Sequence, residues 1–468
     1  MTRTELAVIG AGPAGLAAAT TAAAHGVQVT LIDELPAPGG QYLAPAGAPG
    51  RAHAPLSAAE RRGHALLDAL PGSGIDVRSE TIVWNMAADR RLQLYGAGQM
   101  EELVAQVVIL ACGAREVSVP FPGWTLPGVM TAGAAQLLAK RHGLAAGKRV
   151  LVAGSGPLLL PTAERLARVG ATVVAIVESA PMTAWMRLGT TMWGHWDRVR
   201  EGIHYGWALL RAGIPYRFGR AVTAARGHDR IESATIARLD AAGRPIPGSE
   251  TAVDVDALCV SFGLTPNVEL AQLAGCELVY EPQRGGWTPV VGGCCQTSLA
   301  GVLAIGDMGA VEGAAAGMLE GRLAGLQAAH LVGRLPVTAV TEAITKDAAA
   351  RRRYHRFGAA LNTIFVPPDG LFSLAADDTI VCRCEEVTAG EVRRVIAGGV
   401  TELDSLKQWT RVGQGPCQGR TCGPILAQMI AQQAGRPIAE SGVFHVRPPA
   451  KPVPLAALAA SRGERDVA

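Results

Sequence analysis

The chain has no strong excess of charge of either sign. Its 468 residues include 43 lysines and arginines and 40 aspartates and glutamates, which give a formal net charge of +3 at pH 7. So small an excess does not favour binding to nucleic acid or to an anionic membrane surface. We therefore expect no nucleic-acid partner.

Long apolar runs are missing as well. No 18-residue stretch is both apolar and free of charge, so the sequence predicts no transmembrane segment. No basic segment followed by an apolar one precedes the first expected strand, so we expect no signal peptide. Nine cysteines, an odd number, suit a reducing compartment better than a disulfide framework. The expected location is the cytoplasm, and peripheral contact with the inner membrane through a complex stays open.

Four of the cysteines lie together near the C-terminus. Cys382 and Cys384 form a C-x-C pair, and Cys417 and Cys422 form a C-x4-C pair. Four thiolates suit an iron–sulfur cluster or a structural zinc ion. In an extended segment residues i and i+2 point to the same side, so both thiols of the C-x-C pair can reach one inorganic core. Structural zinc pairs are more often spaced C-x2–4-C. The pattern therefore favours a [2Fe–2S] cluster, with four unligated cysteines as the alternative.

A complete dinucleotide fingerprint opens the chain, between a predicted strand over residues 5–9 and a predicted helix. Its glycines, Gly10, Gly12 and Gly15, allow a tight turn, the approach of a pyrophosphate and close packing of helix on strand. The helix N-terminus would face the phosphates. Asp33, at the end of the next predicted strand, would accept a hydrogen bond from a ribose. The other residues assigned to this site are Pro13, Ala14, Glu34, Gly40, Gln41 and Val83.

Two downstream segments identify the dinucleotide. Gly306 and Asp307 end a predicted strand and resemble the second signature of two-dinucleotide flavoproteins, in which the aspartate binds the ribityl chain of FAD. A helix of small residues is expected over 313–325. Ala111 and Gly113 resemble the A-T-G-A strand end of the same proteins, with Cys112 in place of the threonine as a small buried residue. These resemblances imply that the first site binds FAD.

A second fingerprint is incomplete. Gly154, Ser155 and Gly156 follow a predicted strand, and Glu178 ends the next one, but Leu159 stands where the third glycine belongs. A leucine there either pushes helix and strand apart or requires a different approach of the helix. The segment predicts a nucleotide-binding fold. Its ligand stays open between NAD(P)H, another adenine nucleotide such as ATP or ADP, and none.

Other sequence features do not point to catalysis. No cysteine pair suited to a disulfide reductase lies beside either fingerprint, and adjacent Cys294 and Cys295 have poor geometry for a reversible disulfide. The tryptophan- and methionine-rich segment Trp185–Trp207 predicts either a partner interface or ordinary core packing. His195 within it does not stand out as a base, and no catalytic residue is assigned.

Around the four cysteines the sequence predicts a small helical unit. Thr388 and Glu391 form a capping box before one helix, residues 403–410 form a second, and Pro424 opens a third through Ala434. Cys417 and Cys422 would then lie on the loop before the third helix, where free N–H groups can reach sulfur. Four basic residues are candidates to offset the negative charge of a cluster: Arg383, Lys407, Arg411 and Arg420.

The length predicts about three domains. The chain divides into the first part of an FAD-binding domain (1–125), an inserted NAD(P)-like nucleotide domain (126–257), the second part of the FAD-binding domain (258–345), a connector (346–378), a [2Fe–2S] domain (379–436) and a proline- and alanine-rich tail (437–468) expected to be extended.

The runs 380–388, 406–411 and 415–422 resemble the [2Fe–2S] domain related to bacterioferritin-associated ferredoxin. Its position behind a two-dinucleotide flavoprotein is similar to one family over nearly the whole chain. That family comprises the FAD- and [2Fe–2S]-containing α subunits of bacterial amino- and imino-acid dehydrogenase complexes, which include the A subunit of opine oxidase, the B subunit of hydrogen cyanide synthase and proline or hydroxyproline dehydrogenase subunits. The α subunit of sarcosine oxidase resembles it more distantly.

The resemblance implies an α/β, Rossmann-like two-dinucleotide flavoprotein with a small C-terminal helical ferredoxin-like domain. It implies an oxidoreductase subunit that relays electrons from a partner resembling D-amino-acid oxidase, in which a C–N bond of an amino acid, opine or cyclic imino acid is oxidised. A further small ferredoxin-like subunit, and an FMN at a subunit interface near the basic residues around Arg351, stay open. The alternatives are a self-sufficient NAD(P)H-dependent reductase and a redox-silent module that binds a partner.

Overall fold

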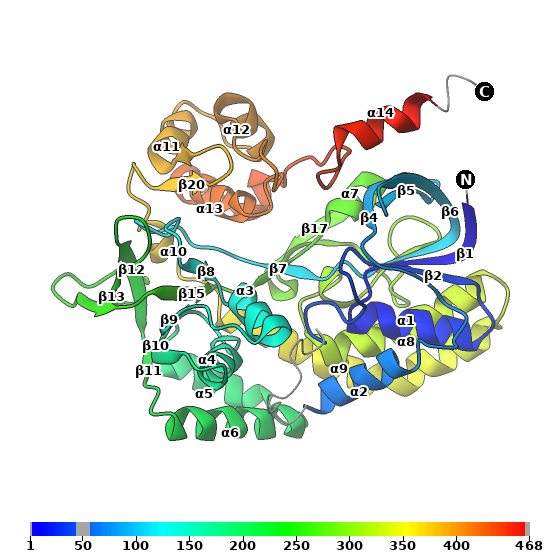
Figure 1. The fold of residues 1–468 in the computed structure, drawn as a ribbon, viewed down its shortest axis with the longest axis horizontal. Coiled ribbons are helices and arrows are strands. Elements are labelled where there is room, and N and C mark those ends of the chain that lie inside the picture. Colours follow the sequence, from blue (N-terminus) through cyan, green and yellow to red (C-terminus); the bar gives the residue numbers. More distant parts are fainter. Residues whose placement is uncertain (1, 44–56, 464–468) are drawn as a thin grey trace.

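The computed structural model describes residues 2–43 and 57–463, in which a mixed and a parallel β-sheet lie side by side beneath a small helical unit (Figure 1). The first sheet has the order β3-β2-β1-β6-β5-β4, with β19 paired to β6. Strands β3, β2, β1, β6 and β19 are parallel, whereas β4 and β5 are antiparallel. Its strands are β1 (Thr2–Ile9), β2 (Val29–Ile32), β3 (Asp76–Arg78), β4 (Ile82–Met86), β5 (Arg91–Gly96), β6 (Gln99–Leu110) and β19 (Val302–Ala304).

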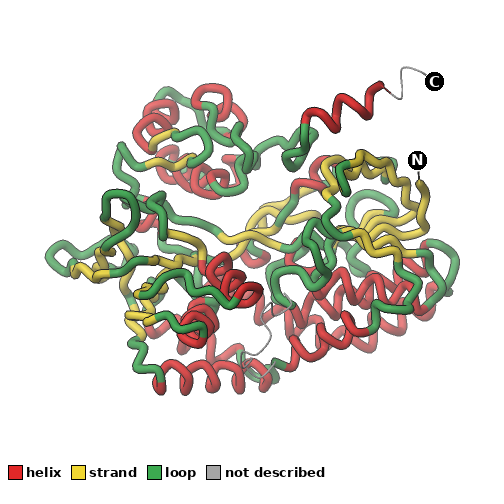
Figure 2. The backbone as a smooth tube through the Cα atoms, in the orientation of Figure 1, coloured by secondary structure: helices red, strands yellow, loops and turns green. Residues whose placement is uncertain are grey.

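Helices cover one face of this sheet (Figures 1 and 2). They are α1 (Pro13–Ala24), α2 (Ala58–Asp68), α8 (Ala314–Leu331) and α9 (Val337–Ile364). Helices α1 and α8 pack closely because α8 carries glycines at the contact. A Cβ on Gly321 would lie 2.1 Å from the carbonyl oxygen of Ala14, and one on Gly325 would lie 2.6 Å from that of Ala18. The predicted small-residue helix is confirmed, and its glycines set the distance between the two helices.

The second sheet is wholly parallel, in the order β11-β10-β9-β15-β8. Its strands are β8 (Val129–Thr131), β9 (Arg149–Gly154), β10 (Thr172–Glu178), β11 (Tyr216–Phe218) and β15 (Ala257–Ser261). It is accompanied by α3 (Ala132–Leu137), a π-helical turn (Leu138–His142), α4 (Leu159–Arg168), α5 (Met182–Thr191) and α6 (Trp196–Arg211). A three-stranded antiparallel sheet flanks it, formed by β12 (Arg220–Arg226), β13 (Ser233–Arg238) and β14 (Thr251–Asp254).

The chain passes between the two sheets twice, and the two connecting segments form a pair of antiparallel strands. β7 (Ala114–Glu116) leads out of the first sheet and β16 (Leu264–Pro266) leads back, in antiparallel register. Beyond them lie α7 (Glu269–Ala274) and a hairpin of β17 (Leu278–Glu281) and β18 (Gly286–Pro289). This two-dinucleotide arrangement, with a helical region after it, confirms the predicted α/β fold class, whereas the exact domain boundaries stay predictions.

The helical unit follows α9 and the short helix α10 (Asp369–Phe372). It contains β20 (Ile380–Cys382), β21 (Val387–Thr388), α11 (Ala389–Ala397), α12 (Leu403–Thr410) and α13 (Cys422–Ala434). Val381 and Leu406 share one hydrophobic core with Val119 and Trp124 of the main body. The indole N–H of Trp124 also donates to the carbonyl oxygen of Ile380 at 2.6 Å. The unit is therefore docked on the rest of the chain.

Several local predictions for this region are confirmed, and others need correction. Thr388 and Glu391 form a reciprocal capping box, and the predicted helix over 403–410 is α12. The third helix, Cys422–Ala434, has Pro424 in its first turn as predicted, but Cys422 lies on the helix and not on the loop. The basic connector residues lie on the 28-residue helix α9. The tail is not extended throughout, because α14 (Leu455–Gly463) is helical. None of the helices within the described residues is long and apolar enough to cross a membrane.

Candidate functional site

The first glycine-rich loop connects β1 to α1 and has no room for a side chain at Gly10 or Gly15. Gly10 has φ +104°, and a Cβ on Gly15 would lie 1.8 Å from the carbonyl oxygen of Gly10. A Cβ on Gly12 would meet no described atom within 4 Å, so the backbone there borders open space. Helix α1 begins at once at Pro13, and the N–H of Leu16 donates to the carbonyl oxygen of Gly12 at 2.9 Å. The preceding N–H groups have no intrahelical acceptor and are available to an anion.

Several residues assigned to the FAD site from distant parts of the sequence converge on this loop. A Cβ on Gly10 would lie 2.4 Å from the carbonyl oxygen of Ala111, and one on Gly40 would lie 2.9 Å from the Cα of Gly12. A Cβ on Gly306 would lie 2.9 Å from the Cβ of Ala14. Four chain segments therefore meet at this loop, at distances that exclude larger side chains.

Asp33 lies at the end of β2 and binds the loop itself. Its carboxylate accepts hydrogen bonds from the N–H of Ala11 at 2.5 Å and of Leu35 at 2.8 Å. Burial raises the pKa of Asp33, and these two N–H groups offset part of the rise. Glu34 is exposed and pairs with Lys451. Gln41 is exposed, and Val83 is buried in the core around Ile32 and Leu110.

Asp307 occupies the turn between β19 and α8. It accepts hydrogen bonds from the N–H of Glu312 at 3.0 Å and of Gly313 at 2.9 Å, and burial raises its pKa. Glu320 on α8 accepts from the N–H of Gly306 at 2.9 Å, and burial raises the pKa of Glu320 to about 7. Asp307 is thus fixed where β19 ends, next to Gly306, which borders Ala14 of α1. Its role toward a flavin stays a prediction.

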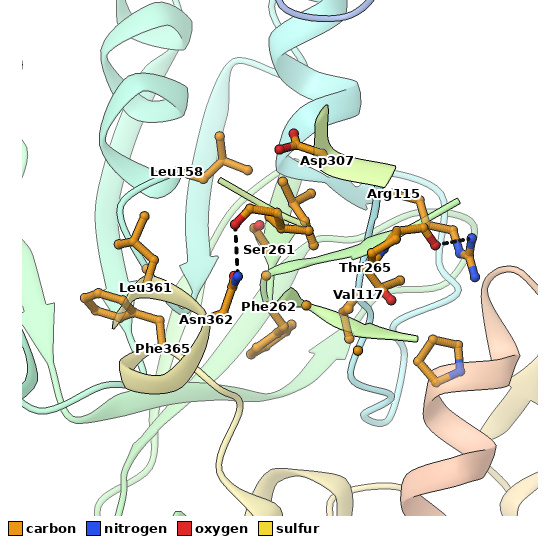
Figure 3. Close-up of a pocket in the computed structure, with 18 of the residues that line it drawn as sticks. Arg115, Val117, Leu158, Ser261, Phe262, Thr265, Asp307, Leu361, Asn362 and Phe365 are labelled. Carbon is orange, nitrogen blue, oxygen red and sulfur yellow. Dashed lines mark hydrogen bonds between the residues drawn. The ribbon is translucent and has the colours of Figure 1, made fainter. Parts of the chain in front are cut away.

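A largely apolar cavity of about 600 Å³ extends from Asp307. Figure 3 shows Asp307, Ser261, Thr265 and Arg115 around this space, with Leu361 and Phe365 on its other side. Its lining continues to Gly419, Arg420 and Phe444 of the helical unit. The volume lies within the usual range for cofactor sites. Together with the glycine cradle and Asp307, this apolar space fits the chemistry of an FAD.

The second glycine-rich loop has a different geometry. Helix α4 begins only at Leu159, and the N–H groups of Leu159 and Leu160 donate to the carbonyl oxygens of Gly156 and Pro157 at 3.3 and 3.2 Å. Leu159 is fully buried in the core between α4 and the second sheet. The sequence left two alternatives for this leucine, and the structure shows the second: the helix approaches differently, starting two residues later than in the first loop.

Glu178, the acidic residue of the second loop, is buried and hydrogen-bonded within the chain. Glu178 is 0% exposed and accepts from the N–H groups of Gly156 and Ala180, both at 2.9 Å, and from the hydroxyl of Tyr216 at 3.2 Å. Burial raises the pKa of Glu178. Phe365, at the end of α9, packs directly against Gly156. A Cβ on Gly156 would lie 3.3 Å from the Cβ of Phe365. The ring of Trp185 packs edge-on against Phe365 at 5.1 Å.

The four clustered cysteines lie in two hydrogen-bonded pairs. The thiol of Cys422 donates to Cys382, which lowers the pKa of Cys382 to about 5 and, with burial, raises that of Cys422. Cys384 contacts Cys417, and burial is the main reason that its pKa is raised. Within residues 2–43 and 57–463, no group of three or more metal-binding side chains is assembled as a ready site. The two pairs lie close enough to act on each other electrostatically, Cys417 on Cys422 and Cys382 on Cys384.

The surroundings of these cysteines nevertheless suit thiolate ligands. The N–H of Gly413 points at both Cys382 and Cys422, and the N–H groups of Cys384 and Glu385 point at Cys382. A Cβ on Gly415 would lie 2.2 Å from the Cβ of Cys384, so the two cysteine loops touch through a glycine. Soft sulfur donors with backbone N–H groups directed at them fit a metal centre of the iron–sulfur type.

The tryptophan-rich segment separates into buried and exposed residues. Trp185 is packed against Phe365, whereas Trp193, Trp196 and Trp207 are 80%, 60% and 61% exposed. His195 is 1% exposed and its Nε2 lies 3.3 Å from the carbonyl oxygen of Arg353. Its ring packs against Phe357, a packing position that gives no support to a role as a base.

Sequence reasoning missed Arg115, Glu269, Phe365 and Phe444, which line the cavity. Arg115 follows the A-T-G-A-like strand end directly, and that position was a usable signal. Glu269, Phe365 and Phe444 belong to no motif.

Comparison with known proteins agrees with this geometry. Residues 4–331 match the family described as pyridine nucleotide-disulphide oxidoreductase, and residues 377–462 match the sarcosine oxidase A3 domain. The A subunit of opine oxidase from Agrobacterium tumefaciens (strain Ach5) is 32% identical over 97% of this chain and 91% of its own length. The HcnB subunit of hydrogen cyanide synthase from Pseudomonas protegens is 32% identical over 98% of both chains.

Solved structures share the fold. L-proline dehydrogenase from P. horikoshii has a TM-score of 0.70 at 21% identity, over 98% of this chain and 79% of that one. Thioredoxin reductase from T. acidophilum has a TM-score of 0.53 at 18% identity, over 70% of this chain and 98% of that one. The chain is therefore a flavin-dependent oxidoreductase of the pyridine nucleotide-disulphide oxidoreductase family and belongs to the group that contains the A subunit of opine oxidase and the HcnB subunit of hydrogen cyanide synthase.

Proposed function

We propose that this chain is the electron-transfer subunit of a hetero-oligomeric dehydrogenase, with FAD at the first loop and a [2Fe–2S] cluster held by Cys382, Cys384, Cys417 and Cys422. A partner subunit resembling D-amino-acid oxidase would oxidise a C–N bond of an amino acid, opine or cyclic imino acid. That oxidation releases two electrons and two protons, and a quinone or another acceptor takes the electrons. Relatives named as subunits of oxidase and synthase complexes support the existence of a partner.

One observation carries the proposal. The cavity is lined both by Asp307 and by Gly419 and Arg420, which lie in the loop between Cys417 and Cys422. A flavin ring in this cavity and a metal centre at the cysteines would be neighbours within one packed body. FAD would supply two-electron chemistry and the cluster one-electron chemistry.

The residues of this chain would bind and orient these groups. The first-turn N–H groups of α1 would hold the pyrophosphate, and Asp307 would hold the ribityl chain. The apolar lining would keep water from the flavin ring. We assign no substrate chemistry to this chain, because the predicted catalytic site lies in the partner.

Two other functions are favoured by single observations. The family description favours a self-sufficient NAD(P)H-dependent reductase. Two observations argue against this reductase: the N–H groups of the second loop already donate to acceptors within the chain, and Phe365 packs against Gly156. In the described part of the chain the cysteines lie in pairs, and no three metal-binding side chains form a ready site. This arrangement favours a redox-silent module that binds a partner. An interfacial FMN, a small ferredoxin-like subunit and a cytoplasmic location stay predictions of the family resemblance.

The test uses protein purified without oxygen, with flavin, iron, sulfide and zinc measured. We expect one FAD and two irons per chain. Photoreduction of the flavin should then produce the electron paramagnetic resonance signal of a reduced [2Fe–2S] cluster. Cys422→Ser should keep the flavin and lose the signal. Stoichiometric zinc without iron would refute the relay, and iron that stays oxidised beside reduced flavin would favour the redox-silent module. Rapid bleaching of the flavin by NADH would favour the reductase.

A further inference from the structure

Three charged residues join the cysteine loop to the flavin-binding body. The Arg115 side chain on β7 donates to Glu269 Oε1 at 2.9 Å, and its Nε donates to the carbonyl oxygen of Arg420 at 3.1 Å. Arg420 Nε in turn lies 3.2 Å from the same Glu269 Oε1. The side chains of Arg115, Glu269 and Arg420 are 23%, 12% and 19% exposed, so water screens these contacts only partly.

The triad also reaches both proposed redox sites. Arg420 Nη1 donates to the carbonyl oxygen of Cys417 at 3.3 Å. On the flavin side, Arg115 Nη1 donates to Asn267 Oδ1 at 3.0 Å, and Asn267 Nδ2 donates to the carbonyl oxygen of Cys112 at 2.9 Å. A continuous series of hydrogen bonds thus runs from the A-T-G-A-like strand end to the cysteine loop.

The triad carries an uncompensated positive charge, because two guanidinium groups share one carboxylate. The other basic residues of the helical unit have different neighbours. Arg383 lies over the Trp124 ring at 5.5 Å and Lys407 over the Phe444 ring at 5.7 Å, whereas Arg411 pairs with Glu385 at 3.0 Å and is 70% exposed. Of the four basic candidates named from the sequence, Arg420 is the one that shares a partly buried carboxylate with a second arginine.

We propose that Arg115, Glu269 and Arg420 form an ion triad that positions the Cys417–Cys422 loop against the flavin cavity and raises the reduction potential of the metal centre there. The inference rests on the proposed function, since it requires a cluster at the cysteines. A four-thiolate [2Fe–2S] centre becomes more negative on reduction, and a nearby buried positive charge stabilises the reduced form. Arg115 and Glu269 are positioning residues, because they act on the centre through Arg420 and the loop.

The test is a pair of charge-changing variants with opposite expected signs. Arg115→Gln removes one positive charge and should lower the midpoint potential of the cluster. Glu269→Gln removes the negative charge at nearly constant shape and should raise it. We expect each variant to shift the reduction equilibrium about tenfold, which is about 59 mV for a one-electron couple. The measurement is a redox titration of the full-length protein, followed by the resonance signal of the reduced cluster.

The controls separate electrostatics from loss of structure. Arg115→Lys keeps the charge but not the guanidinium hydrogen bonds, so it should shift the potential less than Arg115→Gln. Arg393→Gln removes an arginine from α11 that pairs with Asp377 at 2.5 Å, away from the triad, and should leave the potential unchanged. Shifts of the same sign in Arg115→Gln and Glu269→Gln, or no shift in either, would overturn the triad. Wild-type protein without iron would instead refute the proposed function, so the two failures are distinguishable.

Discussion

The two glycine-rich loops start from similar sequences and reach different geometries. In the first, Gly15 allows α1 to begin at Pro13, directly against the strand. In the second, Leu159 takes the same place in the motif, enters the core, and α4 begins at that residue. The third glycine therefore decides where the helix starts.

The start of the helix decides in turn what the loop can bind. The first turn of α1 follows Gly12, where a Cβ would meet no described atom within 4 Å. The N–H groups of Leu159 and Leu160 are used in tight turns, and Phe365 covers Gly156. The exchange of glycine (Gly15) for leucine (Leu159) at one motif position thus distinguishes a first loop that suits a diphosphate from a second loop whose N–H groups are bonded within the chain.

The largest effect on flavin content and stability should follow from replacing Gly15 of the first loop by leucine, the residue that the second loop has at this motif position. Gly15→Leu would place a Cβ 1.8 Å from the carbonyl oxygen of Gly10, a backbone atom that cannot move aside alone. We expect loss of bound flavin and a large fall in the melting temperature. The matched control is Gly12→Ala, whose Cβ points into open space. It should leave the flavin-free protein as stable as wild type while weakening FAD binding. Normal flavin content in Gly15→Leu would contradict the comparison.

The reverse change in the second loop should be smaller. Leu159→Ala removes a fully buried side chain and should lower the free energy of unfolding by about 2–5 kcal/mol, because it leaves a cavity. Flavin content should not change, since the first loop is untouched. Leu144→Ala, at a residue that is 57% exposed, is the control and should have little effect on chemical denaturation. Loss of flavin in Leu159→Ala would show that the loops are coupled.

Nicotinamide nucleotides should bind weakly to the wild-type protein. Anaerobic mixing with NADH or NADPH should leave the flavin absorbance unchanged over seconds, because the second loop has few free N–H groups and is covered. Phe365→Ala should remove only the side chain that packs on Gly156. The affinity for NADH or NADPH should therefore rise modestly, with a dissociation constant that stays in the millimolar range or weaker. Fast bleaching of wild-type flavin would mean that the second loop binds a dinucleotide despite Leu159.

The smallest effect concerns the buried acid of the second loop. Burial raises the pKa of Glu178 above its ordinary value of 4.5, so the folded state holds a proton that the unfolded state has lost. This contribution to stability is full below about pH 4.5 and is lost as the pH rises through the folded pKa. Glu178→Gln cannot titrate, so its melting temperature should fall less than that of wild type over this range. Parallel profiles would show that Glu178 does not titrate there.

Much of the local structure could be predicted because short-range interactions decide it. The capping box of Thr388 and Glu391, the helix over 403–410 and the turn of Gly10, Gly12 and Gly15 depend on neighbouring residues. Where distant contacts compete, prediction was poorer. Cys422 lies on helix α13 and not on the loop before it. Much of the predicted connector belongs to the 28-residue helix α9, whose end brings Phe365 onto the second loop.

By itself the sequence determined the fold class, the first glycine cradle and the clustering of four thiols, because each depends on residue type at fixed spacing. Only the tertiary structure decided that one cavity joins Asp307 to the cysteine loop, that Phe365 closes Gly156, and that Glu269 lies between two arginines. Arg115 and Arg420 are 305 residues apart in the chain. Contacts of that kind follow from the packing of whole elements, which leaves no periodicity or motif in the sequence.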